Sequence, residues 1–204
     1  MALFEMFKKK LSPKAGTLSE MGEFLNNKLK ETIAQWEKHG IYAISLFVYD
    51  NCDNPCEPTV TLGYNTEENF CQKIARASDE IEAKWNYAFW LQNEEYSFGI
   101  GDTQEIVKEW ILQQGFCYYT YEEMFDSDQE PDAETYEGIT EAFVRELIAV
   151  VKDLHKSGFI KNQFGKDIPV LIHELEYYDR IAEQNMEANP PEAVKDFVKF
   201  CIGE

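Results

Sequence analysis

The sequence feature that most constrains the fold is a nine-residue run at 41–49, IYAISLFVY, in which β-branched and aromatic side chains predominate. A cluster rich in Asp, Asn and Pro follows at 50–55, and a second short extended run, TVTLGY, occupies 59–64. This composition is typical of two strands joined by a loop. We therefore predict a β-hairpin on which the rest of the chain packs.

Most of the remaining chain shows apolar residues at helical spacing. Asp102 and Glu105 have the spacing of a capping box, and Gly40 and Gly115 are suited to end helices. His155 falls in the last turn of a predicted helix, where it would favourably meet the helix dipole. The predicted helices cover residues 18–38, 66–77, 102–115, 135–156, 174–187 and 191–201.

Two segments are compatible with more than one structure. Residues 85–91 could form the end of a helix or a third strand, and residues 168–173 a short strand or the start of a helix. Together the patterns predict an α+β fold, with a small, mainly antiparallel sheet packed against several amphipathic helices. The length of 204 residues fits a single domain over 17–204, preceded by an N-terminal arm at 1–16.

The charge of the chain limits its partners. Thirty-eight acidic and 19 basic side chains give a net charge of −19, which repels nucleic acid and anionic lipid surfaces. No apolar run approaches the ~20 residues that cross a bilayer. The lysines at 8–10 follow the first apolar residues instead of preceding them, unlike a secretory signal. We expect a cytoplasmic protein with reduced thiols, which binds neither nucleic acid nor membrane.

Motifs for catalysis or cofactor binding are missing from the sequence. Cys52 and Cys56, with Asp53 between them, could begin a metal site, but a structural zinc site needs four ligands and no second close pair follows. The sequence has no Gly-rich phosphate loop, Gly-x-Ser-x-Gly elbow or His-Glu-x-x-His pair. We predict no metal and no cofactor, and favour a binding protein over an enzyme.

The most distinctive stretch is 116–144, which contains no Lys or Arg and interleaves carboxylates with tyrosines. Acidic runs are usually solvated loops. The alternative is a recognition surface, because carboxylates attract a basic partner and tyrosines are effective interface anchors. The residues predicted to contact such a partner are Tyr118, Tyr119, Tyr121, Glu122, Glu123, Asp126, Asp128, Glu130, Asp132 and Tyr136.

A second functional hypothesis is a hydrolase or small-molecule-binding domain. Trp85 and Trp90 could form the aromatic walls of a cleft, and His173 could supply one titratable group. This hypothesis ranks below the binding protein because no catalytic motif accompanies these residues.

Several stretches also carry a family resemblance. They are the hairpin leading to GYNTE at 63–67, AKWNYAFW at 83–90, FGKDIPVLIHELE at 164–176, and Asn189 with Pro190. With these, the chain from about residue 18 onward resembles a bacterial family known as domain of unknown function 4303. The chain departs from it at 87–90, YAFW, where a Trp-Ala/Glu-Trp arrangement is expected. The resemblance implies no catalytic residues; by analogy, small acidic proteins of this kind act as antitoxins or immunity proteins.

Overall fold

The computed structural model of the chain describes residues 18–37, 39–124 and 133–203. Its centre is a four-stranded sheet in the order β3-β2-β1-β4. The strands are β1 (Ile41–Asp50), β2 (Pro58–Thr66), β3 (Tyr96–Phe98) and β4 (Val170–His173). β1 pairs antiparallel with β2 and β2 with β3, whereas β4 runs parallel to β1. The predicted hairpin and the α+β class with a mainly antiparallel sheet are confirmed.

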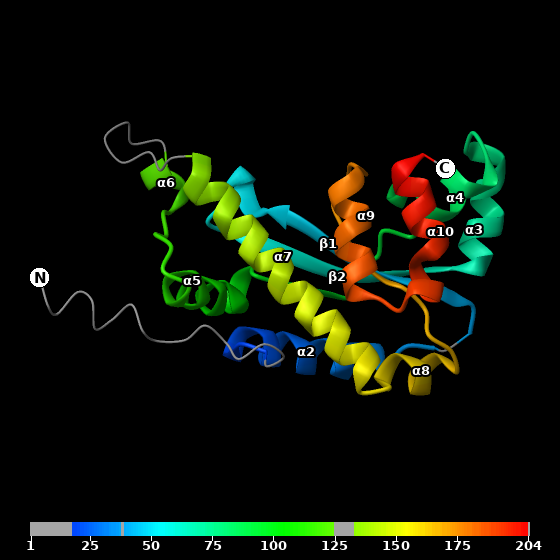
Figure 1. The fold of residues 1–204 in the computed structure, drawn as a ribbon, viewed down its shortest axis with the longest axis horizontal. Coiled ribbons are helices and arrows are strands. Elements are labelled where there is room, and N and C mark those ends of the chain that lie inside the picture. Colours follow the sequence, from blue (N-terminus) through cyan, green and yellow to red (C-terminus); the bar gives the residue numbers. More distant parts are fainter. Residues whose placement is uncertain (1–17, 38, 125–132, 204) are drawn as a thin grey trace, which may run out of the picture.

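Helices surround this sheet (Figure 1). They are α2 (Glu20–Ile33), α3 (Glu67–Lys73), α4 (Glu80–Trp85), α5 (Gln104–Gln113), α6 (Tyr121–Met124), α7 (Ala133–Lys156), α8 (Phe159–Phe164), α9 (Asp179–Ala188) and α10 (Pro191–Ile202). Within the described ranges, no helix combines the length and the apolar composition needed to cross a membrane.

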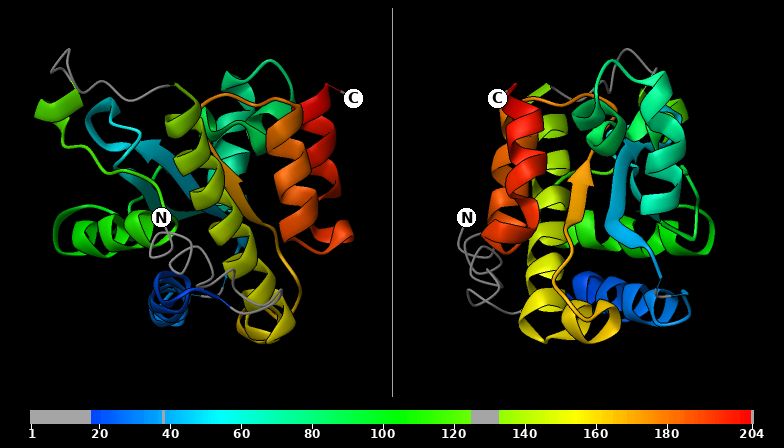
Figure 2. Two further views of the ribbon diagram at one scale, coloured as in Figure 1. Left: turned by 60° about the vertical axis from the view of Figure 1, so that its left-hand side comes forward. Right: turned by 90° about the vertical axis from the view of Figure 1, so that its right-hand side faces the viewer.

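Strand alternation divides the interior into two cores. Ile44, Leu46 and Val48 point into the first core, with buried side chains of α2, α5 and α7. Ala43 and Phe47 point to the other side, into a second core that includes residues of α4, α9 and α10. Figure 1 shows α7 running diagonally across the sheet, and the right-hand view of Figure 2 shows β1 and β4 side by side and pointing the same way.

Side-chain amides of α9 and of its C-cap residue, Asn189, cover the outer edge of β4. Asn189 Oδ1 accepts from the Val170 amide at 2.8 Å, and its Nδ2 donates to the Val170 carbonyl at 3.0 Å. One turn earlier, Asn185 makes the same pair of bonds with Ile172, at 2.9 and 2.7 Å. The exposed row of backbone groups that an edge strand leaves is thereby satisfied by two asparagines instead of a fifth strand.

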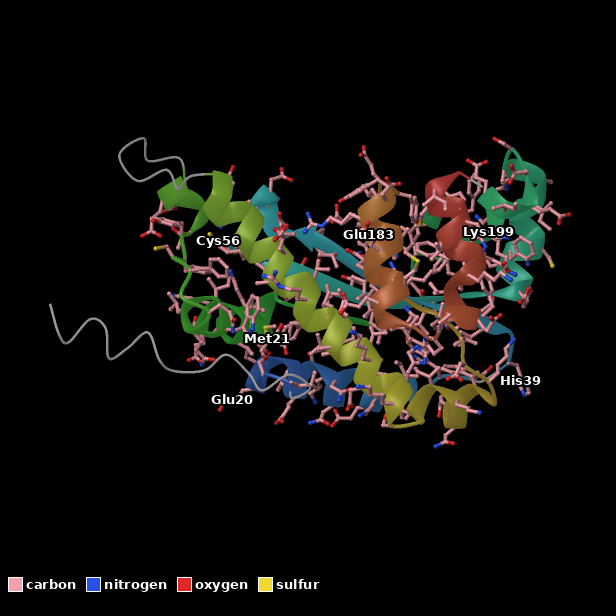
Figure 3. The ribbon with its side chains drawn as sticks, viewed as in Figure 1. Glu20, Met21, His39, Cys56, Glu183 and Lys199 are labelled. Atoms are coloured by element: carbon pink, nitrogen blue, oxygen red, sulfur yellow. The ribbon has the colours of Figure 1, made fainter. Side chains whose placement is uncertain are left out.

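Helix α2 shows how the local sequence determines where a helix begins and ends. The Ser19 side chain accepts from the Gly22 amide and caps α2. Met21 points into the first core, whereas Glu20 points away from the protein (Figure 3). The prediction of a helix to residue 38 was too long: α2 ends at Ile33, and Trp36 reaches the core from the turn that follows.

Other predictions needed correction in detail. Residues 85–91 do not form a strand: α4 ends at Trp85, and a 3₁₀ turn (Tyr87–Phe89) follows, in which the Asn86 side chain accepts from the Ala88 amide. The third strand is β3, which the sequence analysis did not predict.

The helix at α5 is confirmed, but it begins after a 3₁₀ turn, and the predicted capping box of Asp102 and Glu105 does not form: the N-cap residue is Thr103, whose hydroxyl accepts from the Gly99 amide and not from the helix. Residues 1–16 lie outside the described ranges.

Candidate functional site

The candidate site is a pocket at the end of the sheet where the two parallel strands finish. β1 ends at Asp50 and β4 at His173, and ligands of open sheets commonly bind beyond the carboxyl ends of parallel strands. The pocket has a volume of about 490 Å³. We call it the β1–β4 pocket; its lining residues are Phe47, Val48, Tyr49, Asp50, Asp53, Thr140, Glu174, Leu175, Glu176 and Tyr178.

Negative charge dominates this pocket. Asp50 and Asp53 come from the end of β1 and the hairpin loop, and Glu174 and Glu176 from the segment after β4. None of the described lining residues is basic. Arg180 lies at the start of α9 but contacts Glu141 of α7 at 3.4 Å. The pocket therefore offers a negative field to a cationic group.

Asp50 is the most unusual of these carboxylates. It is half-buried at the end of β1, and its carboxylate makes no hydrogen bond or ion pair with any residue that the structure describes. Burial, and then repulsion from Glu174 and Asp53, raise the pKa of Asp50 to about 6. A carboxylate held at such a cost, in a pocket, is a candidate for a functional group.

Replacing Asp50 with asparagine is expected to raise the free energy of unfolding at pH 7.5 by about 1–2 kcal/mol, because it removes a desolvated charge while keeping its shape. The folded state binds the Asp50 proton more tightly than the unfolded state, whose carboxyl has its ordinary pKa of 3.8. The gain should therefore shrink as the pH falls from 6 and vanish below about 4. Urea unfolding of both proteins at pH 7.5 and 3.5 measures it, and an equal gain at both pH values would contradict this interpretation.

Aromatic and aliphatic side chains form the rest of the pocket. The rings of Phe47 and Tyr49 stack, with centroids 5.6 Å apart and planes inclined by 25°. The Tyr178 hydroxyl donates to Glu174 Oε2 at 3.5 Å, and Leu175 between the two glutamates is 71% exposed. Single exposed leucines are common, but one at the rim of a pocket that aromatic side chains line resembles an interface anchor.

Some residues of the predicted recognition stretch, 116–144, make contacts within the protein and are not available to a partner. The Tyr118 hydroxyl donates to Glu57 Oε1 at 3.1 Å, and burial together with Glu57 raises the pKa of Tyr118 to about 12. Glu123 forms a capping box with Thr120 at the start of α6, and its bonds to Thr120 lower the pKa of Glu123. Tyr119 is half-buried against the first core, whereas Tyr121 and Glu122 are exposed.

This stretch lies next to the β1–β4 pocket. The loop that closes the β1–β2 hairpin touches both, because Asp53 lines the pocket and Asn54 Nδ2 donates to the Tyr119 carbonyl at 3.0 Å. Cys56, labelled in Figure 3, is buried in the same loop beside the α6 segment. We call the surface formed by the pocket, Tyr121 and Glu122 the acidic end.

The other predicted contact residues cannot be placed. Asp126, Asp128, Glu130 and Asp132 lie outside the described residues. Tyr136 belongs to the first turn of α7, but its side chain is also outside what the structure describes.

The residues of the alternative cleft do come together, but as part of a core. Trp90 and His173 have ring centroids 6.1 Å apart, and Trp85 packs on Tyr42 and Phe197 in the same cluster. Each of the three predicted residues is 5% exposed or less. They therefore fill the space that a cleft between them would need. Trp85 also borders a separate hollow of about 410 Å³, lined in addition by Phe70, Lys84 and Lys199.

His173 makes a contact that the sequence analysis missed. The Ser45 hydroxyl lies 2.8 Å from His173 Nε2, and His173 Nδ1 lies 3.0 Å from the Glu174 carbonyl oxygen. The carbonyl can only accept, so Nδ1 donates and Nε2 accepts from Ser45. Full burial lowers the pKa of His173 to about 4. No sequence signal marks Ser45, because the contact depends on the pairing of β1 with β4.

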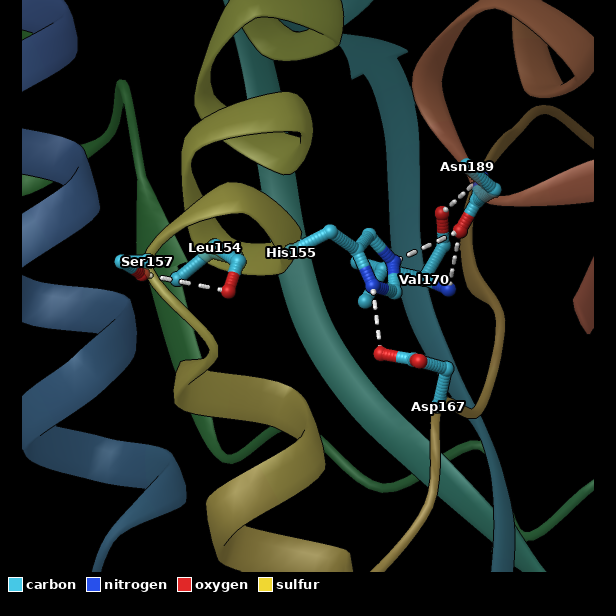
Figure 4. Close-up of polar contacts among 6 residues, drawn as sticks. All are labelled: Leu154, His155, Ser157, Asp167, Val170 and Asn189. Atoms are coloured by element: carbon cyan, nitrogen blue, oxygen red, sulfur yellow. Dashed lines mark hydrogen bonds and ion pairs between the residues drawn. The ribbon is translucent and has the colours of Figure 1, made fainter.

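His155 has a structural role at the other end of β4 (Figure 4). Its Nε2 lies 3.2 Å from Asn189 Oδ1 and its Nδ1 3.4 Å from Asp167 Oδ1. Asn189 is the residue that pairs with the Val170 backbone. His155 thus connects the end of α7 to the asparagines that hold β4 in place.

The described part of the chain holds no group of three or more His, Cys, Asp or Glu side chains arranged to bind a metal ion. Cys52, Cys56, Cys71, Cys117 and Cys201 are all free thiols. The carboxylates of the β1–β4 pocket therefore line a wall instead of converging on one point.

Comparison of the chain with protein-family models, with curated proteins and with solved structures found no match. The resemblance to domain of unknown function 4303 accordingly stays a prediction.

Proposed function

We propose that this chain is a non-catalytic binding protein that engages a basic protein partner through the acidic end, in the manner of an immunity protein or antitoxin that neutralises a cationic toxin. The observation that carries the proposal is the lining of the β1–β4 pocket, where four carboxylates and three aromatic rings meet without a basic residue among the described lining. Complementary charge speeds the encounter with a basic surface, and desolvated aromatic anchors supply affinity.

The acidic end is broader than the predicted stretch. Segments far apart in the sequence contribute to it: the hairpin loop, the first residues of α6, and the segment after β4. Its apolar members Leu175, Tyr178 and Tyr121 are all more than 40% exposed. A surface with apolar side chains surrounded by carboxylates matches the anatomy of a protein interface, with an apolar centre and a polar rim.

The alternative, a hydrolase or small-molecule-binding domain, is favoured by one observation. A serine hydroxyl donating to a histidine whose other nitrogen is oriented by an acceptor is the arrangement of an activated nucleophile, as in Ser45 and His173. Both side chains are 1% exposed, however. A substrate would reach Ser45 only if the surrounding aromatic side chains moved, which makes the binding protein the better-supported proposal.

A pair of charge-matched variants tests the proposed function. The site variant replaces four carboxylates of the acidic end by their amides; the control variant does the same at four exposed glutamates elsewhere. Each removes four negative charges, so the two differ only in where the charge is lost. The site substitutions are Asp53→Asn, Glu122→Gln, Glu174→Gln and Glu176→Gln, and the control substitutions are Glu20→Gln, Glu68→Gln, Glu183→Gln and Glu192→Gln.

Immobilised wild-type and control proteins are expected to retain the same basic protein from an extract of the source cell at low salt, and to release most of it at high salt, because screening weakens exposed ion pairs. The site variant should retain at least about tenfold less, as expected when several interfacial charges are lost. Quantitative mass spectrometry measures the retained protein. Equal retention by the site and control variants, or a retained partner that is not basic, would refute the proposal.

A further inference from the structure

The hollow that Trp85 borders, with a volume of about 410 Å³, lies between α4 and α10, beside α3 (Figure 1). We call it the α4–α10 hollow. No residue lines both this hollow and the β1–β4 pocket. Its lining consists of Glu80, Ile81, Lys84 and Trp85 of α4, Asp196 and Lys199 of α10, and Phe70 of α3.

Charges of both signs line this hollow without pairing. Glu80 and Lys84 stand four residues apart on α4, and Asp196 and Lys199 three apart on α10, spacings at which opposite charges on a helix commonly pair. Such pairs do close on α2 and α5, at 2.8 and 3.9 Å. The four charged groups of the hollow, in contrast, form no ion pair or side-chain hydrogen bond with any residue that the structure describes. Both helices therefore keep these groups available to a ligand.

Aromatic rings, and not a carboxylate, hold the ammonium group of Lys84. Its Nζ lies 5.5 Å from the ring centroid of Tyr42, 5.8 Å from that of Phe70 and 5.4 Å from that of Trp85. Cation–π attraction to three rings positions the ammonium, but it provides none of the hydrogen-bond acceptors that the three N–H donors require. An anionic group in the hollow would supply such an acceptor to a cation that is already in place.

The remaining lining indicates which ligand fits. A simple anion would meet the two carboxylates of the hollow, and a simple cation would meet the two lysines, whereas a ligand with one charge of each sign can pair with both. Between the charged residues of α4, Ile81 is 52% exposed, and Phe70 is also partly exposed. The ligand that this surface matches is a zwitterion with an apolar group, and the volume is sufficient for an amino acid.

We propose that the α4–α10 hollow binds a free α-amino acid with an apolar side chain. The two lysines donate to its carboxylate, the two acidic residues accept from its ammonium group, and its side chain packs on Ile81 and Phe70. This inference goes beyond the proposed function, because it gives the chain a small-molecule ligand at a site that shares no residue with the acidic end.

L-leucine and three analogues that each lack one part of it test this directly. The analogues are 4-methylpentanoate, which lacks the ammonium group, 3-methylbutylamine, which lacks the carboxylate, and glycine, which lacks the side chain. Each is titrated into the full chain, and the readouts are the NMR signals of the Ile81 methyl groups and of the backbone amides at 80–85 and 196–199. Leucine is expected to shift these signals in a saturable way, and each analogue to bind at least about tenfold more weakly.

Two pairs of charge-matched variants on α10 locate the binding. Asp196→Asn and Lys199→Gln are each expected to weaken leucine binding about tenfold, because each removes one charged partner of the ligand. Their controls, Glu192→Gln and Lys195→Gln, remove the same charges from exposed positions of the same helix that do not line the hollow, and should leave binding unchanged. Thermal unfolding verifies that the four variants are folded.

Three results would overturn this inference: no saturable shift with leucine, binding of 4-methylpentanoate or 3-methylbutylamine as tight as that of leucine, or equal weakening by the site and control variants. The second result would make the hollow a site for simple anions or cations. None of these results bears on the proposed function, since the substitutions leave every residue of the acidic end in place.

Discussion

Replacing Asn185 with alanine is expected to lower the free energy of unfolding by about 3 kcal/mol, which is a large share of the 5–15 kcal/mol typical of a domain. Asn185 is fully buried, and its side chain both accepts from the Ile172 amide and donates to the Ile172 carbonyl. The carbonyl keeps a second donor, Gln184 Nε2 at 2.8 Å. The amide would lose the one partner that it has among the described residues, at a fully buried position where water has little access.

Urea unfolding measures this change, and Glu183→Ala is the matched control. Glu183 belongs to the same helix and is exposed (Figure 3), so its replacement by alanine should change stability by less than about 0.5 kcal/mol. A loss of stability for Asn185→Ala as small as that of the control would show that the asparagines of α9 do not secure β4. Asn189→Ala is expected to behave like Asn185→Ala, because it frees the Val170 amide in the same way.

The asparagines of α9 also illustrate what the sequence could and could not predict. The spacing of Asn185 and Asn189 is that of one helical face, the face that also carries the buried residues Ile181 and Ala182 one turn earlier. Two amides in such a position could be recognised as buried polar groups in need of partners. Their partners could not be named, because the pattern along a helix carries no information about which strand lies opposite.

The same limit applies to the sheet. The hairpin was predictable because its strands are close in sequence and each is rich in β-branched and aromatic residues. β3 was missed because three residues, Tyr96–Phe98, are too few for a periodic signal. The parallel pairing of β1 with β4, at Ser45 and Leu171, joins residues more than 120 positions apart. No local pattern specifies such a contact.

The candidate site, too, could be predicted from the sequence only in part. Composition alone identified the acidic, tyrosine-containing stretch, of which Tyr121 and Glu122 remain exposed. The β1–β4 pocket was missed because Asp50 and Glu174 are unremarkable residues at strand ends until the two strands are placed side by side. Charge could therefore be predicted as a property of the chain, but its concentration around a pocket is a property of the fold.

β4 links stability to the site. It carries His173 in the second core and is followed directly by Glu174, Leu175 and Glu176, which line the pocket. Because this short strand is held by β1 on one side and by Asn185 and Asn189 on the other, the position of the pocket wall depends on these two asparagines as well as on β1. His173 adds a dependence on pH.

Protonation of His173 is expected to lower the free energy of unfolding by about 3 kcal/mol as the pH falls from 6.5 to 4. The ring is neutral in both states above pH 6.5. Between pH 6.5 and 4 the unfolded chain takes up a proton that the folded chain excludes, because burial lowers the pKa of His173 to about 4. Below pH 4 both states are protonated and the loss stops growing.

Asp50 has the opposite effect over nearly the same range, because its raised pKa lets the folded state bind a proton that the unfolded state does not hold above pH 3.8. In the wild-type protein the two contributions oppose each other between pH 6 and 4, so that Asp50 masks part of the effect of His173. The histidine is therefore best measured in an Asp50→Asn background, where urea unfolding at pH 6.5 and 4.5 should reveal its loss of stability. Adding His173→Gln should reduce this loss, since glutamine does not titrate.

The difference between the Asp50→Asn protein and the Asp50→Asn, His173→Gln double variant isolates His173 from all other titrating groups, which are the same in both. An independent measurement is the ¹³Cε1 shift of the His173 ring, which should not titrate until the pH approaches 4. A ring that titrates near pH 6.5, or equal pH dependence in the two variants, would mean that water reaches His173. An accessible His173 beside Ser45 would in turn remove the argument against the hydrolase, because that argument rests on their burial.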